Sequence, residues 1–226
     1  FGLAAFSMEA WSQMVNAAAV VHYQTGGKVK VPTVFTMMHG MMPTENSQHS
    51  RSHYAGLANS PGIQIVLAST PYDIKGLMPT ALHSDNPTVV MNHAMVMPME
   101  GEVPDEDYLI PFGEADIKRE GDDVTIVGTS HKVHVALAAA DALAEDGISA
   151  EVIDPRTIVP LDREAILNSV RKTGRLVVVD DAPLTCGFAS EVAALVAESA
   201  FESLKAPIVR QTLHYSYTHL TLPTIL

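Results

Sequence analysis

The chain contains a single cysteine, Cys186, among its 226 residues. One cysteine excludes an intrachain disulfide and a cysteine-based metal site, and it suits a reducing compartment, so we expect a cytoplasmic protein. No apolar run reaches the roughly 20 residues that a membrane-spanning helix needs, and no signal peptide is visible. We therefore expect no membrane partner.

Basic residues are also scarce. Lys and Arg number 14 against 26 Asp and Glu, which gives a net charge of −12. Because nucleic-acid binding needs a basic face to neutralise phosphates, we expect no nucleic-acid partner. Hydrophobic residues make up 47% of the chain, which is enough to bury a core.

Several common catalytic motifs are missing. No glycine-rich loop of the dinucleotide or Walker kind follows a strand-like run. Ser69 and Ser130 lie near strand ends, but neither stands in a G-x-S-x-G elbow. No helix carries an H-x-x-x-H pair with an acidic partner, so a zinc site is not expected.

The alternation of apolar runs predicts an α/β fold. The first half predicts helices over residues 6–24 and 71–84 and strands over 31–37, 63–67 and 88–91. The second half predicts strands over 124–128, 148–153, 176–179 and 207–209 and helices over 133–146, 162–172 and 188–204. Repeated strand–helix units indicate parallel sheets with helices on both faces. Between the halves, residues 98–111 are acidic and proline-rich, and we interpret them as a linker between two domains, 1–110 and 111–210.

One histidine stands out. His49 lies at the centre of a polar loop, residues 45–52, between two strand-like runs. Such loops present catalytic groups at the end of a sheet, and an imidazole can transfer protons near neutral pH. A solvated loop histidine explains the same pattern, and the residues alone leave both interpretations open.

Other candidates have ordinary explanations. Phe6, near the start of the first helix, could stack on a planar heterocycle, but core packing is the simpler interpretation. Asp180 and Asp181 end a strand, where α/β folds place binding groups, although we interpret Asp181 as the start of a turn before Pro183. Glu191 is interpreted as a helix-dipole partner or interface residue. Five of the other nine histidines are interpreted as structural or peripheral: His39, His53, His93, His131 and His134.

Ordered segments carry a family resemblance. They are residues 6–16 (FSMEAWSQMVN), 23–27 (YQTGG), 48–50 (QHS), 71–77 (PYDIKGL), 85–87 (DNP), 100–104 (EGEVP), 152–157 (VIDPRT), 160–162 (PLD) and 172–180 (KTGRLVVVD). In this order they resemble the beta subunit of thiamine-diphosphate-dependent 2-oxo acid dehydrogenases, the pyruvate, branched-chain and acetoin group.

The resemblance implies a fold and an activity. It implies a thiamine pyrimidine-binding domain over residues 1–110, a transketolase C-terminal-like domain over 111–210 and an atypical tail, 211–226. The implied reaction is oxidative decarboxylation of a 2-oxo acid, pyruvate first, with acyl transfer to lipoyl groups. The implied partners are an alpha subunit, in an alpha2beta2 tetramer, and a dihydrolipoyl acyltransferase core.

The resemblance also implies site roles. Thiamine diphosphate would sit between the subunits, with its diphosphate and Mg²⁺ held mainly by the alpha subunit. Phe6 matches the aromatic residue beside the aminopyrimidine, and His49 matches the histidine that assists proton transfer and acyl delivery. The residues near Ala81, Ser84 and Asn86 match a segment that binds a structural K⁺ in some members.

Three departures qualify the match. The family's cofactor-activating glutamate lies upstream of Phe1, so we expect a fragment that is inactive by itself. Residues 36–42 (TMMHGMM) replace an Arg-Gly-Pro-like segment, which affects substrate identity. The tail after Arg210 departs from the family, and we expect residues 211–226 to be an artefact and the least ordered part. Two alternatives stay open: a transketolase-like ketol-transfer subunit, and a docking or assembly module without catalysis.

Overall fold

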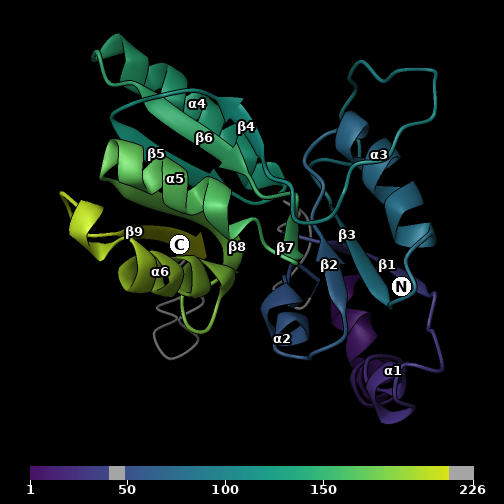
Figure 1. The fold of residues 1–226 in the computed structure, drawn as a ribbon. Helices are drawn as coiled ribbons and strands as arrows, with labels where there is room; N and C mark the ends of the chain where they lie inside the picture. The colour runs from purple at the N-terminus through teal and green to yellow at the C-terminus, as the bar shows by residue number, and fades with distance from the viewer. Residues whose placement is uncertain (41–48, 214–226) are drawn as a thin grey trace, which may run out of the picture.

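Two β-sheets organise the chain, and helices cover their faces (Figure 1). The computed structural model describes residues 1–40 and 49–213. The strand order is β1-β3-β2-β7 in the first sheet and β4-β6-β5-β8-β9 in the second. The α/β class predicted from the sequence is confirmed, with parallel strands forming most of each sheet.

The first sheet is built around β3 (Thr88–His93). The strands β1 (Val34–His39) and β2 (Gln64–Val66) flank β3 and run parallel to it. β1 starts three residues later than predicted, after Pro32, which has no N–H to donate to a neighbouring strand. The fourth strand, β7 (Thr157–Val159), comes from the second half of the chain and pairs antiparallel with β2.

The second sheet has four parallel strands and one antiparallel edge. The parallel strands are β5 (Val124–Gly128), β6 (Ala150–Asp154), β8 (Leu176–Pro183) and β9 (Val209–Leu213). The edge strand β4 (Asp116–Arg119) pairs antiparallel with β6. Neither β4 nor β7 was predicted, because both are short and pair with strands that lie far away in the sequence.

The main helices lie close to where the sequence predicts them: α3 (Pro71–Leu82), α4 (His131–Glu145), α5 (Arg163–Thr173) and α6 (Phe188–Ser199). Their ends follow local chemistry. The Thr70 side chain accepts a hydrogen bond from the Asp73 N–H at the start of α3, and Asp162 caps α5 in the same way. Gly174 ends α5 with a φ of 73°.

The short helical pieces differ from expectation. The predicted helix over 6–24 is helical, but its winding changes from 3₁₀ in η1 (Ala4–Ala10) to π in η2 (Gln13–Ala18) and α in α1 (Val21–Gln24). A further helix, α2 (Tyr54–Ala58), follows the polar loop. The helix predicted to reach residue 204 ends at Ser199 and continues as a 3₁₀ turn, η3 (Phe201–Ser203).

A single hydrophobic cluster joins the two sheets. It contains Met37 and Met91 from the first sheet and Ile153 and Val178 from the second, all at most 2% exposed. Residues 98–115 form no helix or strand. The domain boundary stays a prediction, because β7 lies in the first sheet although it follows the linker in sequence. Of the predicted tail, Gln211–Leu213 belong to β9, and the rest lies outside the described residues.

Candidate functional site

Phe6 and His49 meet in the structure. Their ring centroids are 5.6 Å apart, with the ring planes at 73° in an edge-to-face contact. Phe6 comes from η1, which contacts β1, and Leu3, directly before η1, forms a bridge to Met38 of β1. The Phe6 side chain is 46% exposed, so the interpretation as a plain core residue is wrong. Residues 45–48 of the loop that was predicted to present His49 (residues 45–52) lie outside the described residues; His49 itself is half-buried.

The segment that follows His49 is held by buried polar contacts. Ser52 Oγ lies 3.1 Å from His39 Nδ1, at the end of β1. Two residues later, the Tyr54 hydroxyl donates a hydrogen bond to Asp180 Oδ1 of β8. Thr129 Oγ1 donates to the same oxygen at 2.8 Å. The residues next to His49 are therefore tied to both sheets.

A row of aromatic rings runs through the junction between the sheets. The His39 ring makes edge-to-face contacts with Tyr54 at 5.6 Å and with His93 at 5.1 Å. The His93 ring stacks on His131 at the start of α4, with centroids 4.9 Å apart. His39 and His93 are each 1% exposed and lie opposite each other in the register of β1 and β3. The two strand ends thus place a pair of imidazoles in the interior.

Burial and the neighbouring charged groups shift the pKa values of His39 and Asp181 in this row of rings. Burial and repulsion from His93 lower the pKa of His39 to about 3, so this ring is neutral at pH 7. His93 Nδ1 accepts from the Met95 N–H at 3.0 Å, and His93 Nε2 lies 2.9 Å from Asp181 Oδ2. Burial works to raise the pKa of Asp181, but His93 and Lys132 outweigh it and lower the pKa to about 2.

The structure corrects the interpretation of the two aspartates. The turn predicted at Asp181 is wrong: β8 continues to Pro183, and both Asp180 and Asp181 are 1% exposed. Each carboxylate faces a different partner, Tyr54 for Asp180 and His93 for Asp181. Because buried carboxylates need partners, these contacts explain why two adjacent acids stand at the end of a core strand.

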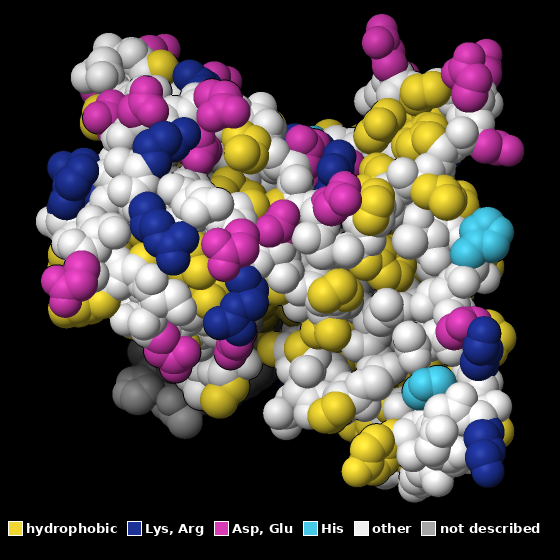
Figure 2. Space-filling model, in the orientation of Figure 1, with side chains coloured by type: hydrophobic (Ala, Val, Ile, Leu, Met, Phe, Trp, Pro, Cys, Tyr) yellow, Lys and Arg dark blue, Asp and Glu magenta, His cyan; other side chains and the backbone are white. Residues whose placement is uncertain are grey.

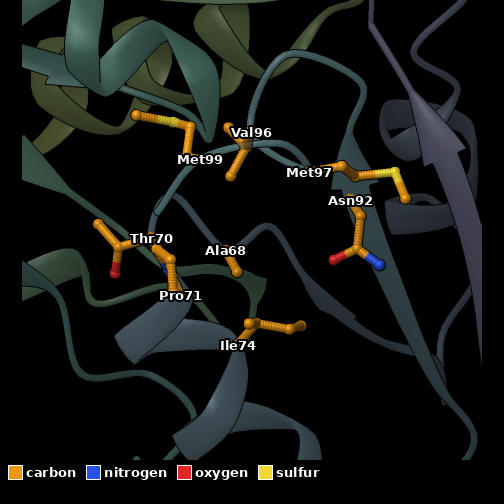
Figure 3. A pocket seen from close by; sticks show the side chains of 8 residues that line it. All are labelled: Ala68, Thr70, Pro71, Ile74, Asn92, Val96, Met97 and Met99. Carbon is orange, nitrogen blue, oxygen red and sulfur yellow. The ribbon is translucent and has the colours of Figure 1, made fainter. Parts of the chain in front are cut away.

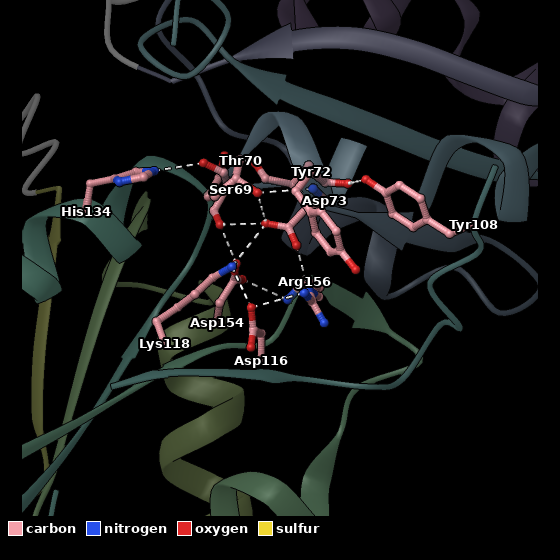
Figure 4. A network of polar contacts seen from close by, with 12 residues as sticks. Ser69, Thr70, Tyr72, Asp73, Tyr108, Asp116, Lys118, His134, Asp154 and Arg156 are labelled. Carbon is pink, nitrogen blue, oxygen red and sulfur yellow. Dashed lines mark hydrogen bonds and ion pairs between the residues drawn. The ribbon is translucent and has the colours of Figure 1, made fainter. Parts of the chain in front are cut away.

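A second polar cluster lies where α3 meets the second sheet (Figure 4). Its carboxylates are Asp73, Asp116 and Asp154, and its cations are Lys118 and Arg156. The Arg156 Nε and Nη2 atoms bind Asp73 at 2.8 Å and Asp116 at 3.0 Å, and Lys118 Nζ lies 2.6 Å from Asp116. Beside this cluster, His134 Nε2 donates to the Ser69 carbonyl at 2.7 Å.

Two cavities lie apart from the Phe6–His49 pair. One, of about 250 Å³, opens at the ends of β2 and β3 and is mainly apolar; Figure 3 shows its lining of Ala68, Thr70, Pro71, Ile74, Asn92, Val96, Met97 and Met99. The other, of about 700 Å³, lies between α2 and the start of α6 and includes Cys186 and Glu191. Neither is lined by Phe6 or His49.

The residues predicted to bind K⁺ hydrogen-bond with one another. The Ser84 N–H donates to the Ala81 carbonyl at 3.2 Å, and the Asn86 N–H donates to Ser84 Oγ at 3.1 Å. Ser84 Oγ in turn donates to Gln64 Oε1 at 2.5 Å. In the part of the chain that the structure describes, no group of three or more His, Cys, Asp or Glu residues is arranged to hold a metal ion.

Five exposed acidic residues lie close together in sequence on the linker. Glu100, Glu102, Asp105, Glu106 and Asp107 are exposed, and Figure 2 shows acidic side chains on the loop beside α3 and mixed with Lys and Arg over the second sheet. Within residues 1–40 and 49–213, no helix is long and apolar enough to cross a membrane.

Sequence reasoning missed the buried partners of the His49 segment. His39 and His93 were interpreted as structural or peripheral, and Asp181 as a turn residue. A signal was present, since His39 and His93 each end an apolar strand and Asp180 directly follows the apolar run 176–179, and the ends of parallel strands are where polar groups gather. What the sequence lacked was the register that places these strand ends together.

The comparisons with known proteins agree with this arrangement. Residues 3–98 match the family described as "Transketolase, pyrimidine binding domain", and residues 113–226 match "Transketolase, C-terminal domain". Among solved structures, "Split gene transketolase, inactive beta4 tetramer" shares the fold, with a TM-score of 0.77 at 24% identity, over 94% of this chain and 65% of that one.

Curated relatives are more similar in sequence. The acetoin:2,6-dichlorophenolindophenol oxidoreductase subunit beta of Bacillus subtilis is 43% identical over 89% of this chain and 59% of its own length. The 2-oxoisovalerate dehydrogenase subunit beta of Bacillus subtilis is 41% identical, over 91% and 63%. The pyruvate dehydrogenase E1 component subunit beta of Rickettsia conorii is 43% identical, over 90% and 62%.

The chain therefore spans about three fifths of the length of the curated relatives it matches. The predicted resemblance is confirmed across both halves. With both matched regions in order along one chain, it belongs to the family that joins a transketolase pyrimidine binding domain to a transketolase C-terminal domain, alongside the beta subunits of 2-oxo acid dehydrogenases.

Proposed function

We propose that the chain is part of the beta subunit of the decarboxylating component of a 2-oxo acid dehydrogenase complex. The observation that carries the proposal is the contact between Phe6 and His49, because it joins an exposed aromatic ring to a proton-transfer group. The relatives named above support the reaction class. The proposed substrate is a 2-oxo acid, with pyruvate first, and the proposed acceptor is a lipoyl group.

The residues present fit one end of thiamine diphosphate. Phe6 is 46% exposed, so part of its ring is available to stack on a planar aminopyrimidine. We assign the diphosphate and its Mg²⁺ mainly to an alpha subunit, because no Gly-Asp-Gly motif is present in this chain. When bound, the cofactor supplies the electron sink that decarboxylation of a 2-oxo acid needs.

The proposed role of His49 is to move protons at its imidazole nitrogens while the acyl group passes to the lipoyl acceptor. The edge-to-face contact places the His49 ring next to Phe6, with ring centroids 5.6 Å apart. Ser50 and Ser52, which follow His49 in the chain, are buried at 2% and 6% exposure, and Ser52 contacts His39. This chain thus contributes an orienting surface and a proton carrier.

The direct test uses the full-length protein with its alpha subunit, thiamine diphosphate and Mg²⁺. We expect decarboxylation of pyruvate or a branched-chain 2-oxo acid. His49→Ala should lower acyl transfer to lipoamide at least about 10²-fold, the low end for one acid–base group. His83→Ala is the matched control, because His83 is exposed and far from Phe6 in sequence. Unchanged transfer in His49→Ala would contradict the role of His49, and turnover of sugar phosphates in place of 2-oxo acids would favour the ketol-transfer alternative.

The proposed partners are an alpha subunit, in an alpha2beta2 tetramer, and a dihydrolipoyl acyltransferase core in the cytoplasm. The acidic linker surface would suit a basic partner surface. Mass measurement of the co-expressed subunits checks the tetramer. Binding to the acyltransferase core without any effect of thiamine diphosphate would favour a docking module instead.

A structural K⁺ at Ala81, Ser84 and Asn86 is a separate proposal. The Ala81 carbonyl and the Ser84 hydroxyl are oxygen ligands of a kind that hard cations accept. Both oxygens already take part in hydrogen bonds, so the ion would have to share them. Thermal unfolding in K⁺ and in Na⁺ at equal ionic strength tests the site: a higher Tm in K⁺ supports it, and equal values count against it.

A further inference from the structure

The segment after His49 has two buried anchors on opposite sides. Ser52 is anchored at β1 of the first sheet, by His39 at 3.1 Å. Tyr54 is anchored at β8 of the second sheet, through Asp180. Only four residues separate His49 from Tyr54, so little chain is available to absorb a shift of the second anchor. The position of His49 is therefore linked to Asp180, which lies 126 positions from Tyr54 in the sequence.

The Tyr54–Asp180 contact has the features of a strong hydrogen bond. Tyr54 is 0% exposed and Asp180 is 1% exposed, so water cannot replace either partner. Burial and the nearby Asp180 raise the pKa of Tyr54 well above its usual value, so the hydroxyl stays protonated and donates. A hydroxyl that donates to a carboxyl group in the interior makes a stronger bond than a neutral pair in water, and it leaves an unpaired group if it is broken.

We propose that Tyr54 and Asp180 are positioning residues. Through the hydrogen bond between them, the second sheet holds the segment that follows His49 and keeps His49 against Phe6. The inference rests on the proposed function, since it assigns Tyr54 and Asp180 to the support of proton transfer by His49. Thr129 belongs to the same device, because its hydroxyl donates to Asp180 Oδ1 at 2.8 Å and fixes the direction of the carboxyl group.

Tyr54→Phe tests the bond with the smallest change. It removes the hydroxyl and keeps the ring that packs against His39. Because a shift of about 1 Å can cost about 10²-fold in rate, we expect acyl transfer to lipoamide to fall at least ~10-fold. Decarboxylation measured with an artificial dye as acceptor should stay near the wild-type value, because this readout bypasses the lipoyl transfer.

Tyr108→Phe is the matched control. It removes a tyrosine hydroxyl that donates to the Tyr72 carbonyl at 2.7 Å, away from His49, and it should leave both activities unchanged. In a His49→Ala background, adding Tyr54→Phe should cause no further loss, because Tyr54 acts through His49. Equal losses in dye reduction and lipoamide transfer, a further loss in the double variant, or no loss at all would each overturn the proposal.

Asp180→Asn separates the hydrogen bond from the charge. The amide oxygen can still accept from Tyr54 and Thr129, so transfer should remain close to wild type, whereas Asp180→Leu should lose transfer as Tyr54→Phe does. Loss of transfer in Asp180→Asn, with the fold intact by circular dichroism, would contradict the hydrogen bond as the active element.

A chemical readout covers the case in which the assembled enzyme shows no thiamine-dependent activity, which would refute the proposed function. In the full-length assembled protein, the carbethoxylation rates of His49 and of the exposed His83 are followed by mass spectrometry with diethylpyrocarbonate. Tyr54→Phe should raise the rate at His49 relative to His83, and Tyr108→Phe should leave the ratio unchanged. An unchanged ratio in Tyr54→Phe would overturn the positioning role independently of the reaction.

Discussion

Asp154→Asn should change how the stability of the protein depends on pH. Asp154 is fully buried at the end of β6, where it accepts from the Ser69 hydroxyl at 2.5 Å and lies 3.9 Å from Lys118 Nζ. It shares its cluster with two other carboxylates, Asp73 and Asp116, and the cluster holds two cations (Figure 4). With all three carboxylates ionised, the two cations leave this cluster with a net charge of −1.

The protonation of Asp154 removes this excess charge. Burial raises the pKa of Asp154 from 3.8 to about 7, with the Asp73 charge acting in the same direction and the Ser69 hydrogen bond and Lys118 opposing it. A carboxyl group whose pKa is raised by folding stabilises the folded state fully below the unfolded pKa, near 4, and this stabilisation is lost as pH rises through about 7. The difference of about 3 pKa units corresponds to about 4 kcal/mol.

The direction in which Asp154 changes the stability with pH gives the expected result. Asparagine cannot ionise, so the free energy of unfolding of Asp154→Asn, relative to wild type, should increase on the order of 4 kcal/mol between pH 4 and pH 8. Urea unfolding followed by circular dichroism at several pH values measures this difference. The control is Asp107→Asn, which removes an exposed carboxylate on the linker.

The shape of the difference curve decides the outcome. A difference between Asp154→Asn and wild type that stays constant within about 1 kcal/mol from pH 4 to pH 8 would refute the reasoning, because it would mean that Asp154 ionises in the folded protein as it does in the unfolded chain. An increase confined to pH below 4 would assign the effect to another group.

Three further changes have defined outcomes. His39→Gln removes a ring whose pKa falls to about 3 on folding, and whose burial in the neutral form therefore costs the wild type stability as pH falls below 6.5. The free energy of unfolding of the variant, relative to wild type, should rise by about 3 kcal/mol from pH 6.5 to pH 4 in the same urea assay. Gly40→Ala places a Cβ 2.0 Å from His93 Nε2 at a φ of +88°, and should lower the free energy of unfolding by at least about 2 kcal/mol; a smaller loss would show that the imidazole can move aside. Asp162→Ala removes the cap of α5 and the acceptor for the Ala115 N–H, and should lower Tm with a loss of about 1–2 kcal/mol; an unchanged Tm would mean that water replaces both bonds.

Local chemistry in the sequence was enough to locate most elements. The cap at Thr70 followed by Pro71 and the stop at Gly174 act within one turn of chain, so the ends of α3 and α5 could be predicted closely. The buried strands of the second sheet were also found, because a run such as Val124–Gly128 needs no partner information to be apolar. The short strands β4 and β7 were missed because their hydrogen bonds come from distant residues.

The sequence by itself determined the α/β class, the family and the choice of Phe6 and His49 as candidates. Only the tertiary structure decided that their rings touch, that His39 pairs with His93, and that Tyr54 reaches Asp180 across 126 residues. The reason is physical. Capping and hydrophobic periodicity act over a few residues, whereas the partner of a buried polar group is fixed by strand register and by the packing of two sheets against each other.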